Sequence, residues 1–343
     1  MYFCAVKGTI MRRIIICLFI MLVQTSMAAA GDGDYQKEPE RLKVGLVLGG
    51  GGAKGAATVG VLKTIESVGI PIDYIAGTSI GAIVGGLWAC GVRSEEMEAL
   101  FRSQEWSSLL TDRNDAYRNQ IWAEDDGVTY IFGFPVSRKN KQERKTGKKT
   151  FGIVQGDHIF HLIDSISGFR DSISFDELPV PFKCVAFDCT TGREVVLDHG
   201  KLPTALRASM AIPGLFKPVE LDSMILLDGG ICNNLPVDVV KAMGADVVIA
   251  IDLTQNKHDD HKEKSLWSQL SLDALADIFL TRPDKAKYDA NCEVVDVYIN
   301  PRLDGCDALS FQPDKIDKMI RIGEQTGKKH RKALKRLKKK IQQ

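Results

Sequence analysis

Residues 44–81 read VGLVLGGGGAKGAATVGVLKTIESVGIPIDYIAGTSIG. The apolar run 44–48 predicts a strand, which enters a glycine-rich turn and then a helix over 56–68. A second predicted strand, 72–76, enters another glycine-flanked turn and a helix over 82–90. Two strand–turn–helix units in succession predict a three-layer α/β/α fold with a central, mostly parallel sheet.

The rest of the chain continues this alternation. The further predicted strands and helices are, in order, a helix over 152–163, strands over 182–188 and 194–197, a helix over 203–209, a strand over 225–227, a helix over 236–243, strands over 247–251 and 294–299, and one long helix from 316 onward. We assign the chain four parts after a leader: a main domain over 42–252, a lid-like excursion within it over 104–150, a C-terminal segment over 253–326 that completes the same α/β domain, and a basic helical tail over 327–343.

Composition excludes several classes of protein. The 343 residues are 44% hydrophobic and 26% charged, which is typical of a globular protein and not of a disordered or collagen-like chain. The 45 basic and 44 acidic residues nearly cancel, so bulk charge predicts no nucleic-acid partner. The distribution is uneven, because residues 31–326 hold 33 basic and 44 acidic residues, a net charge of −11, whereas 327–343 hold nine basic residues and no acidic one.

The first thirty residues resemble an export signal. Arg12 and Arg13 precede ten apolar residues, 14–23, and the small residues 28–30 follow. This arrangement predicts a secretory signal peptide over 1–30, since ten residues are too few for the ~20 that span a membrane. An uncleaved N-terminal anchor is the alternative. We expect an exported protein that is periplasmic, outer-membrane-associated or secreted.

Six cysteines follow the predicted leader. They are Cys90, Cys184, Cys189, Cys232, Cys292 and Cys306. An even count in an exported protein permits disulfides, but the spacing matches no zinc pattern. Their apolar surroundings favour buried free thiols. We expect no metal and no cofactor.

The turn Gly77-Thr78-Ser79-Ile80-Gly81 has the spacing of a nucleophile elbow. A nucleophilic serine must stand on a sharp strand-to-helix turn, and flanking glycines tolerate the crowding there. Ser79 would also lie at a helix N-terminus, whose partial positive charge favours a developing alkoxide. The predicted strand before it and helix after it favour a catalytic role over a chance match.

The element Gly50-Gly51-Gly52-Ala53-Lys54-Gly55 has three interpretations. It has the place of a dinucleotide-binding turn, between a strand and a helix, but the acidic residue required about twenty positions on would be Asp73, at a strand start. It lacks the Lys-Ser/Thr of a phosphate-binding loop. Consecutive glycines can also expose backbone N–H groups to a carbonyl oxygen that becomes negative, forming an oxyanion hole. The serine motif that follows favours this third interpretation.

The base that would activate Ser79 is better sought among carboxylates than among histidines. His258, His261 and His330 lie in charged surroundings typical of solvated surface groups. Asp228 ends a predicted strand and precedes Gly229 and Gly230. A carboxylate in a dry site can have a pKa high enough to act as a base, and the alternative is a plain turn aspartate.

Together these motifs, with the block Ala208–Phe216, resemble the patatin-like phospholipases, especially their bacterial exported branch. The resemblance implies a Ser–Asp dyad with Ser79 as nucleophile and Asp228 as proton acceptor. It also implies oxyanion donors at Gly50, Gly51 and Gly52, with Lys54 supporting the loop. The motif glycines would be Gly55, Gly77, Gly81, Gly229 and Gly230.

The activity implied by the resemblance is hydrolysis of lipid carboxylic esters, as by a phospholipase A or lysophospholipase, through an acyl-enzyme. The substrate would be a phospholipid or another lipid ester. An acyltransferase or small-ester esterase on the same site is one alternative, and a non-catalytic lipid- or partner-binding scaffold is another. The sequence does not define an oligomeric state.

The tail 327–343 combines cations with Leu334, Leu337 and Ile341 at helical spacing. This pattern is compatible with a helix that lies on an anionic membrane surface. A solvated helix that frays is the alternative.

Overall fold

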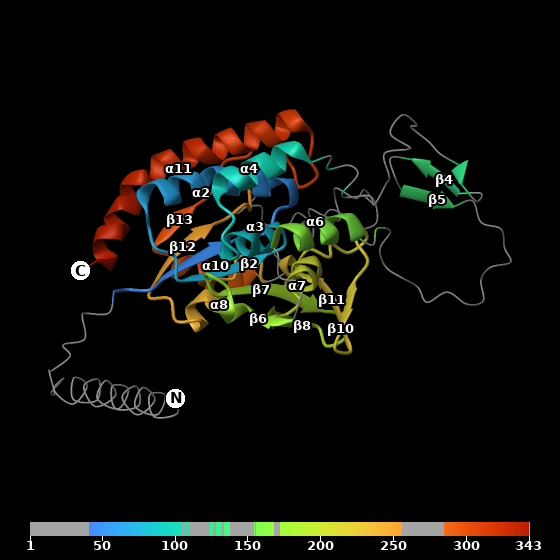
Figure 1. Cartoon of the computed structure of the whole chain (residues 1–343), viewed down its shortest axis with the longest axis horizontal. Coiled ribbons are helices and arrows are strands. Elements are labelled where there is room, and N and C mark those ends of the chain that lie inside the picture. Colours follow the sequence, from blue (N-terminus) through green and yellow to red (C-terminus); the bar gives the residue numbers. More distant parts are fainter. Residues whose placement is uncertain are drawn as a thin grey trace, which may run out of the picture. The chain divides into compact units, whose positions relative to one another are not determined.

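An eight-stranded sheet runs through the molecule in the order β10-β11-β7-β2-β1-β12-β13, with β8 paired to β7 (Figure 1). The computed structural model describes residues 41–104, 106, 109, 124–125, 128–131, 134–137, 154, 156–167, 172–255 and 285–342. The strands of this sheet are β1 (Val44–Leu48), β2 (Tyr74–Thr78), β7 (Phe182–Asp188), β8 (Arg193–Leu197), β10 (Val219–Leu221), β11 (Met224–Asp228), β12 (Val247–Ile251) and β13 (Val297–Ile299).

The sheet is mostly parallel, as predicted. Strands β7, β2, β1, β12 and β13 pair in parallel, whereas β8, β10 and β11 join them antiparallel. β2 and β11 share one edge of β7. β2 pairs with its first half as far as Val185, and β11 pairs with its second half from Ala186.

Helices cover both faces of the sheet. The α-helices are α2 (Gly55–Val68), α3 (Ile80–Ala89), α4 (Ser94–Ser103), α6 (Asp157–Ser167), α7 (Leu202–Ser209), α8 (Val237–Ala242), α10 (Lys285–Glu293) and α11 (Pro313–Ile341). All five residues of β1 are buried, and they alternate between two cores. Leu46 and Leu48 join the core beneath α2, α3 and α11, whereas Val47 joins the smaller core beneath α8. This confirms the three-layer α/β/α prediction.

Two predicted elements are displaced along the chain. The strand expected over 72–76 is β2, two residues later, because Asp73 is held by the backbone of Val44 before pairing begins. The helix expected over 152–163 begins at Asp157. Val154 instead forms a parallel bridge with Phe216, and Gly156 has a φ of 79° that ends this extended segment.

Helix α11 contains the predicted basic helical tail, and the long helix predicted from 316 onward is present. It is one continuous helix from Pro313 to Ile341, and the basic tail is its last half. Its crossing with α2 is close: a Cβ on Gly323 would lie 2.0 Å from the Ala57 carbonyl oxygen. Residues 42–343 form a single compact unit, to which the segment after 252 contributes β13 and α11.

The remaining described strands form two small sheets. β3 (Glu124–Asp125), β4 (Val128–Ile131) and β5 (Phe134–Ser137) pair antiparallel, and β6 (Ile173–Ser174) pairs with β9 (His199–Gly200). Most of the predicted lid-like excursion and the whole predicted leader lie outside the described residues. Among the described helices, none is both long and apolar enough to cross a membrane.

The six cysteines after the leader are free thiols. Cys184 and Cys306 are buried, as predicted. Cys90, Cys232 and Cys292 are partly buried, whereas Cys189 is exposed, so the prediction of burial is wrong there. Cys189 directly follows Asp188, the last residue of β7, where the chain turns towards β8.

Candidate active site

Ser79 stands on a sharp turn between β2 and α3. Its φ of 57° and ψ of −127° are unusual for a residue other than glycine, and its side chain is buried. The turn is possible because its neighbours lack side chains: a Cβ on Gly77 would lie 2.5 Å from the Gly81 carbonyl oxygen, and one on Gly81 would lie 2.1 Å from that of Leu48. The elbow predicted from the glycine spacing is therefore present.

Asp228 is the hydrogen-bond partner of this serine. Ser79 Oγ donates to Asp228 Oδ2 at 2.7 Å, and the other carboxylate oxygen accepts the N–H of Gly230 at 2.7 Å. Among the described residues, no histidine hydrogen-bonds to either side chain. The structure thus brings together the two residues that the sequence named as nucleophile and base, without a third member.

The carboxyl group of Asp228 lies in a dry environment, with 1% of the residue exposed. Burial raises its pKa from 3.8 to about 6, while the hydrogen bonds from Ser79 and Gly230 oppose the rise. A carboxylate with this pKa is ionised at neutral pH, yet it is a stronger proton acceptor than an exposed aspartate. These are the properties required of a general base.

Ser209, at the end of α7, holds the backbone of the nucleophile. Its Oγ accepts the Ser79 N–H at 3.0 Å and donates to the Val185 carbonyl oxygen at 2.6 Å. Ser209 is fully buried, so these bonds do not compete with water. Together the two hydrogen bonds anchor the elbow to β7 at Val185, the last residue of β7 that pairs with β2.

The glycine-rich loop after β1 lies directly against the nucleophile. A Cβ on Gly50 would be 3.1 Å from the Cβ of Ser79. Asn234 clamps this glycine on both sides: its carbonyl oxygen accepts the Gly50 N–H at 3.2 Å, and its Nδ2 donates to the Gly50 carbonyl oxygen at 3.4 Å. The Gly50 N–H, one of the three oxyanion donors implied by the resemblance, is therefore already engaged.

The next two amides of the loop remain available. Within the described part of the chain, the N–H groups of Gly51 and Gly52 have no hydrogen-bond partner, whereas that of Ala53 donates to the Ala308 carbonyl oxygen at 2.8 Å. Gly52 has a φ of 57°, which favours glycine. Lys54 closes the turn, its N–H donating to the Gly51 carbonyl oxygen at 3.2 Å, and its side chain is largely buried. Two adjacent free N–H groups beside a buried serine can stabilise an oxyanion.

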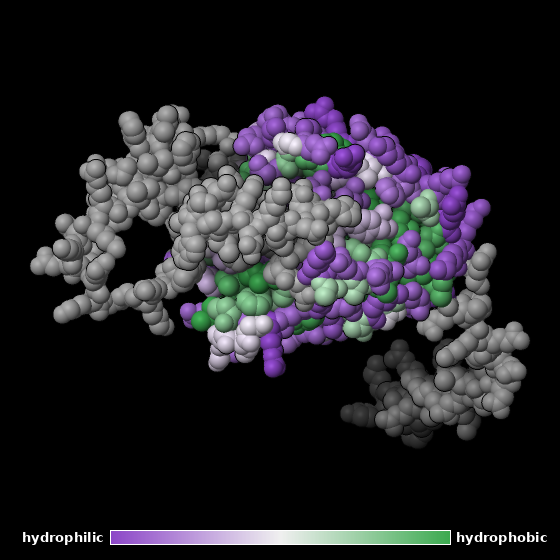
Figure 2. Space-filling model, turned by 180° about the vertical axis from the view of Figure 1, so that it is seen from behind, coloured by the Kyte–Doolittle hydropathy of each residue, from purple (hydrophilic) through white to green (hydrophobic). Residues whose placement is uncertain are grey.

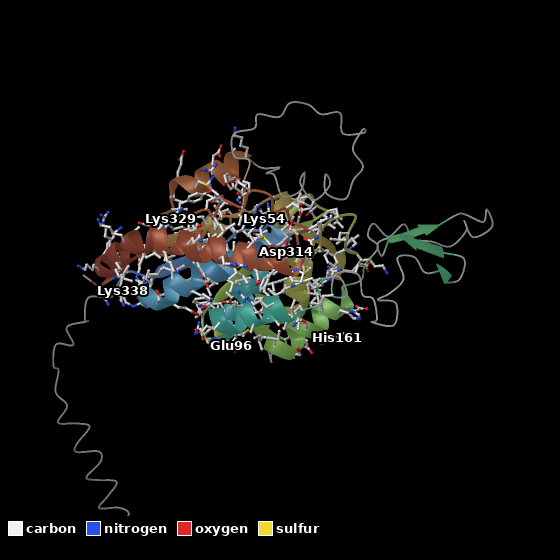
Figure 3. All side chains as sticks on the ribbon, turned by 90° about the horizontal axis from the view of Figure 1, so that it is seen from above. Lys54, Glu96, His161, Asp314, Lys329 and Lys338 are labelled. Carbon is white, nitrogen blue, oxygen red and sulfur yellow. The ribbon has the colours of Figure 1, made fainter. Side chains whose placement is uncertain are left out.

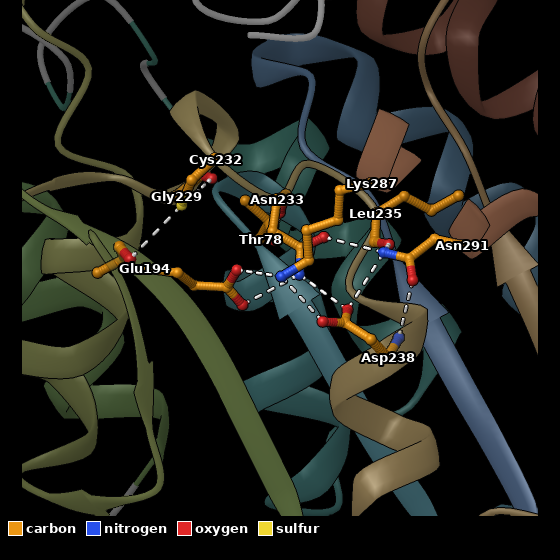
Figure 4. A network of polar contacts seen from close by, with 10 residues as sticks. Thr78, Glu194, Gly229, Cys232, Asn233, Leu235, Asp238, Lys287 and Asn291 are labelled. Carbon is orange, nitrogen blue, oxygen red and sulfur yellow. Dashed lines mark hydrogen bonds and ion pairs between the residues drawn. The ribbon is translucent and has the colours of Figure 1, made fainter. Parts of the chain in front are cut away.

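A polar network supports the loop that follows Asp228 (Figure 4). Thr78, the residue before the nucleophile, donates its hydroxyl to the Asn233 carbonyl oxygen at 2.7 Å. The Asn233 side chain donates to Glu194 at 3.1 Å and to Asp238 at 2.9 Å. Lys287 of α10 forms ion pairs with both of these carboxylates. The network thus ties the loop after Asp228 to Thr78, the residue before Ser79.

Gly55 and Gly229 have packing roles, because each lies too close to a neighbouring residue to carry a side chain. A Cβ on Gly55 would lie 2.3 Å from Ile80, and one on Gly229 would lie 2.2 Å from the Val185 carbonyl oxygen. Sequence reasoning missed the roles of Ser209 and of Asn234. Both lie inside or beside noted motifs, but nothing in their spacing indicates which backbone atoms they would contact.

The structure therefore combines a three-layer α/β/α fold with a buried serine at a strand–helix elbow, and this serine is hydrogen-bonded to a buried carboxylate. The chain belongs to the patatin-like phospholipase family, whose family model matches residues 46–241.

Several relatives carry names from one subgroup of esterases. Neuropathy target esterase sws of Drosophila melanogaster is 33% identical over 219 residues, covering 63% of this chain and 13% of that protein. Lysophospholipase NTE1 of Mycosarcoma maydis is 34% identical over 255 residues, covering 72% and 12%. An uncharacterised NTE family protein of Mycobacterium bovis is 33% identical over 211 residues, covering 62% and 49%. The chain thus spans less than half the length of these relatives.

Two proteins of known structure match this chain in part. VipD from Legionella pneumophila has a TM-score of 0.45 and 14% identity, covering 86% of this chain and 67% of that one. The type III effector protein ExoU has a TM-score of 0.42 and 16% identity, covering 85% and 53%.

Proposed function

We propose that this protein is a lipid acyl hydrolase of the lysophospholipase or phospholipase A type, which cleaves carboxylic esters through Ser79 and Asp228. The observation that carries the proposal is the 2.7 Å hydrogen bond from the Ser79 hydroxyl to a carboxylate buried in a dry site. Membership of the patatin-like family and the names of the relatives, esterase and lysophospholipase, support the substrate class.

In the first half of the proposed reaction, Ser79 Oγ attacks the ester carbonyl carbon while its proton passes to Asp228 Oδ2. The carbonyl oxygen becomes negative and accepts hydrogen bonds from the free N–H groups of Gly51 and Gly52. The tetrahedral intermediate then collapses, the bond to the alcohol breaks, and the leaving oxygen takes the proton from Asp228. An acyl group remains on Ser79.

In the second half, water replaces the alcohol. Asp228 removes a proton from the water as it attacks the acyl carbon, and the same amides hold the new oxyanion. Ser79 leaves with the proton returned by Asp228, and a carboxylic acid is released. One carboxylate serves as base and acid in turn, so the proposed cycle needs no histidine.

Labelling with a fluorophosphonate tests the chemistry directly. Wild-type protein should become covalently labelled, Ser79→Ala should not, and Asp228→Asn should react more slowly by a factor of about 10² or more. Labelling that persists in Ser79→Ala would place the nucleophile elsewhere. Failure of folded wild type to react would favour a binding scaffold instead.

Product analysis tests the substrate class. Lysophosphatidylcholine should yield free fatty acid with water as acceptor, and the Ser79→Ala variant should yield none. If added alcohols or lysolipids receive the acyl group in preference to water, the protein is an acyltransferase. If only short-chain soluble esters react, it is a small-ester esterase.

Export is a further part of the proposal and rests on the sequence of residues 1–30 alone. N-terminal sequencing of protein from the exported fraction should give a mature chain that starts near Gly31. An intact N-terminus in membrane-bound protein would indicate an uncleaved anchor.

A further inference from the structure

The second half of α11 carries a dense set of exposed cations. We call this set the basic face. It consists of the exposed side chains of Lys328, Lys329, Arg331, Lys332, Lys335, Arg336, Lys339 and Lys340. No acidic residue occurs between 327 and 343. Figure 2 shows hydrophilic residues along the rim that α11 forms in Figure 1.

The opposite side of the same helix belongs to the core. Leu334, Leu337 and Ile341 are 0%, 6% and 0% exposed, and all three lie in the main hydrophobic cluster. At 3.6 residues per turn, the direction of these three side chains is opposite to the mean direction of the basic face. The apolar side is therefore not available for insertion into a membrane, which corrects the amphipathic tail expected from the sequence. Any binding by this helix must use charge.

The two halves of α11 differ in how their charges are compensated. In the first half, Asp317 pairs with Arg102 at 3.4 Å and with Arg321 at 3.9 Å, and Glu324 pairs with Lys63 at 2.7 Å.

In the second half, among the described residues, one cation of the basic face has an acidic partner: Lys340 lies 3.3 Å from Asp296. Like charges four residues apart, such as Lys328 and Lys332, repel each other on a helix. The helix dipole favours cations in the last turn, but it does not extend to residues 328–336. Within the described part of the chain, this repulsion is therefore compensated by an ion pair at Lys340 alone.

We propose that the basic face of α11 binds the surface of an anionic lipid bilayer by electrostatic adsorption, without insertion. The inference rests on the proposed function, because a lipid acyl hydrolase finds its substrate at such surfaces. Charge complementarity supports this occupant: Lys and Arg near anionic headgroups are attracted over about a Debye length. The net charge of −11 on residues 31–326 would be repelled, so the molecule would adsorb with α11 towards the bilayer.

The basic face lies away from the nucleophile. Lys338 Nζ donates a hydrogen bond to the carbonyl oxygen of Val68, the last residue of α2, at 2.8 Å. The glycine-rich loop is at the opposite, N-terminal end of α2. Figure 3 shows Lys338 at the far end of α11 from Asp314 and Lys54. Adsorption through this face would concentrate the enzyme at the bilayer and leave the site at Ser79 uncovered.

Vesicle co-sedimentation with the full chain tests the proposal. Vesicles of phosphatidylcholine with about 30% phosphatidylglycerol should bind the protein at about 50 mM salt and release it at about 500 mM, because adsorption is screened. Vesicles of phosphatidylcholine alone should not bind. Replacing Lys328, Lys332, Lys335 and Lys339 by Gln should weaken binding more than about tenfold.

Two control variants make the result specific. One replaces Arg193, Lys201, Arg302 and Arg321 by Gln, which removes the same charge from exposed positions elsewhere and should leave binding nearly unchanged. The other replaces the same four lysines of the basic face by Arg, which keeps their charge and should keep binding. Equal losses in the two Gln variants would overturn the proposal, and so would binding that survives high salt.

Two further measurements distinguish lipid binding by the basic face from nucleic-acid binding and from a direct effect on catalysis. If the four Gln substitutions weaken binding to a DNA duplex at equal salt more than they weaken binding to anionic vesicles, the basic face is a nucleic-acid surface and the lipid proposal fails. Hydrolysis of a soluble ester by the four-Gln variant should equal that of wild type, while hydrolysis of lipid in anionic vesicles should fall with binding. Vesicle binding can also be measured with the Ser79→Ala variant, in which catalysis plays no part. The binding measurement therefore tests the basic face even if the proposed function fails.

Discussion

Thr78 and Asp228 lie opposite consecutive residues of β7, Val185 and Ala186, although they end strands that run in opposite directions. β2 runs parallel to β7 along one of its edges and ends at Thr78. β11 runs antiparallel to β7 along the same edge and ends at Asp228. The residue after Thr78 is the nucleophile. A hydrogen bond between side chains 149 residues apart therefore follows from where two strands end on a third.

The rate of fluorophosphonate labelling should depend on the protonation of Asp228. Burial raises the pKa of this carboxyl to about 6, and only its ionised form can accept the proton of Ser79. The rate should be constant above about pH 7 and fall about tenfold per pH unit well below pH 6. Labelling rates measured between about pH 4.5 and about pH 8 check this. A rate that stays unchanged down to the lower limit would exclude Asp228 as the base.

Replacing Asp228 by Asn should stabilise the fold while it slows the chemistry. Because the folded pKa of Asp228 is raised above its unfolded value of 3.8, its contribution to stability is full below that value and is lost as pH rises through about 6. At pH 7.5 the Asn variant should gain about 1–3 kcal/mol in free energy of unfolding.

Urea titration of both proteins at neutral pH and near pH 4 measures this difference. The advantage of Asn should shrink at the acidic pH, where the wild-type carboxyl also binds a proton. An Asn variant that is less stable at pH 7.5 would show that the buried charge is better compensated than its surroundings indicate.

Ser209→Ala should slow labelling of Ser79 by about 10–10². The substitution removes the acceptor of the Ser79 N–H and so frees the strained elbow. A buried unpaired amide also costs about 1–3 kcal/mol of stability. Ser209→Thr keeps the hydroxyl and should recover part of the rate. Ser94→Ala is a control: it removes a buried serine that bonds to Glu66, so stability should fall without loss of rate.

Asn234→Ala should lower kcat and leave KM for a soluble ester nearly unchanged. The substitution removes the Asn234 Nδ2 bond to the Gly50 carbonyl oxygen and leaves only the backbone bond, so the free amides of the next two glycines could shift from the developing oxyanion. A displacement of about 1 Å can cost about 10² in rate. Steady-state kinetics check this. A rise in KM with unchanged kcat would indicate contact with substrate in place of loop positioning.

Leu337→Ala should lower the free energy of unfolding by about 2–4 kcal/mol. The side chain is packed into the main core beside α2, so its truncation leaves a cavity. Exposed Lys339→Ala on the next turn should change stability by less than about 0.5 kcal/mol. Equal and negligible effects would mean that this part of α11 is detached in solution.

The elbow, the Asp-Gly-Gly turn and most strand positions could be predicted because they depend on local patterns. Gly77 and Gly81 mark a turn that other residues cannot form, and five buried apolar residues mark β1. The position of α11 could not be predicted in the same way. Cations with periodic leucines are typical of a surface helix, and its core packing depends on Gly323 meeting Ala57, far away in sequence. The positioning roles of Ser209 and Asn234 likewise depend on contacts with distant backbone atoms.

The meeting of β2 and β11 on β7 has a consequence for synthesis of the chain. Ser79 leaves the ribosome long before Asp228, and the two can meet only after β7 and β11 have both docked. A nascent or truncated chain therefore carries the serine without its base. For an enzyme of the proposed kind, hydrolytic activity is therefore absent until most of the sheet, up to β11, has assembled.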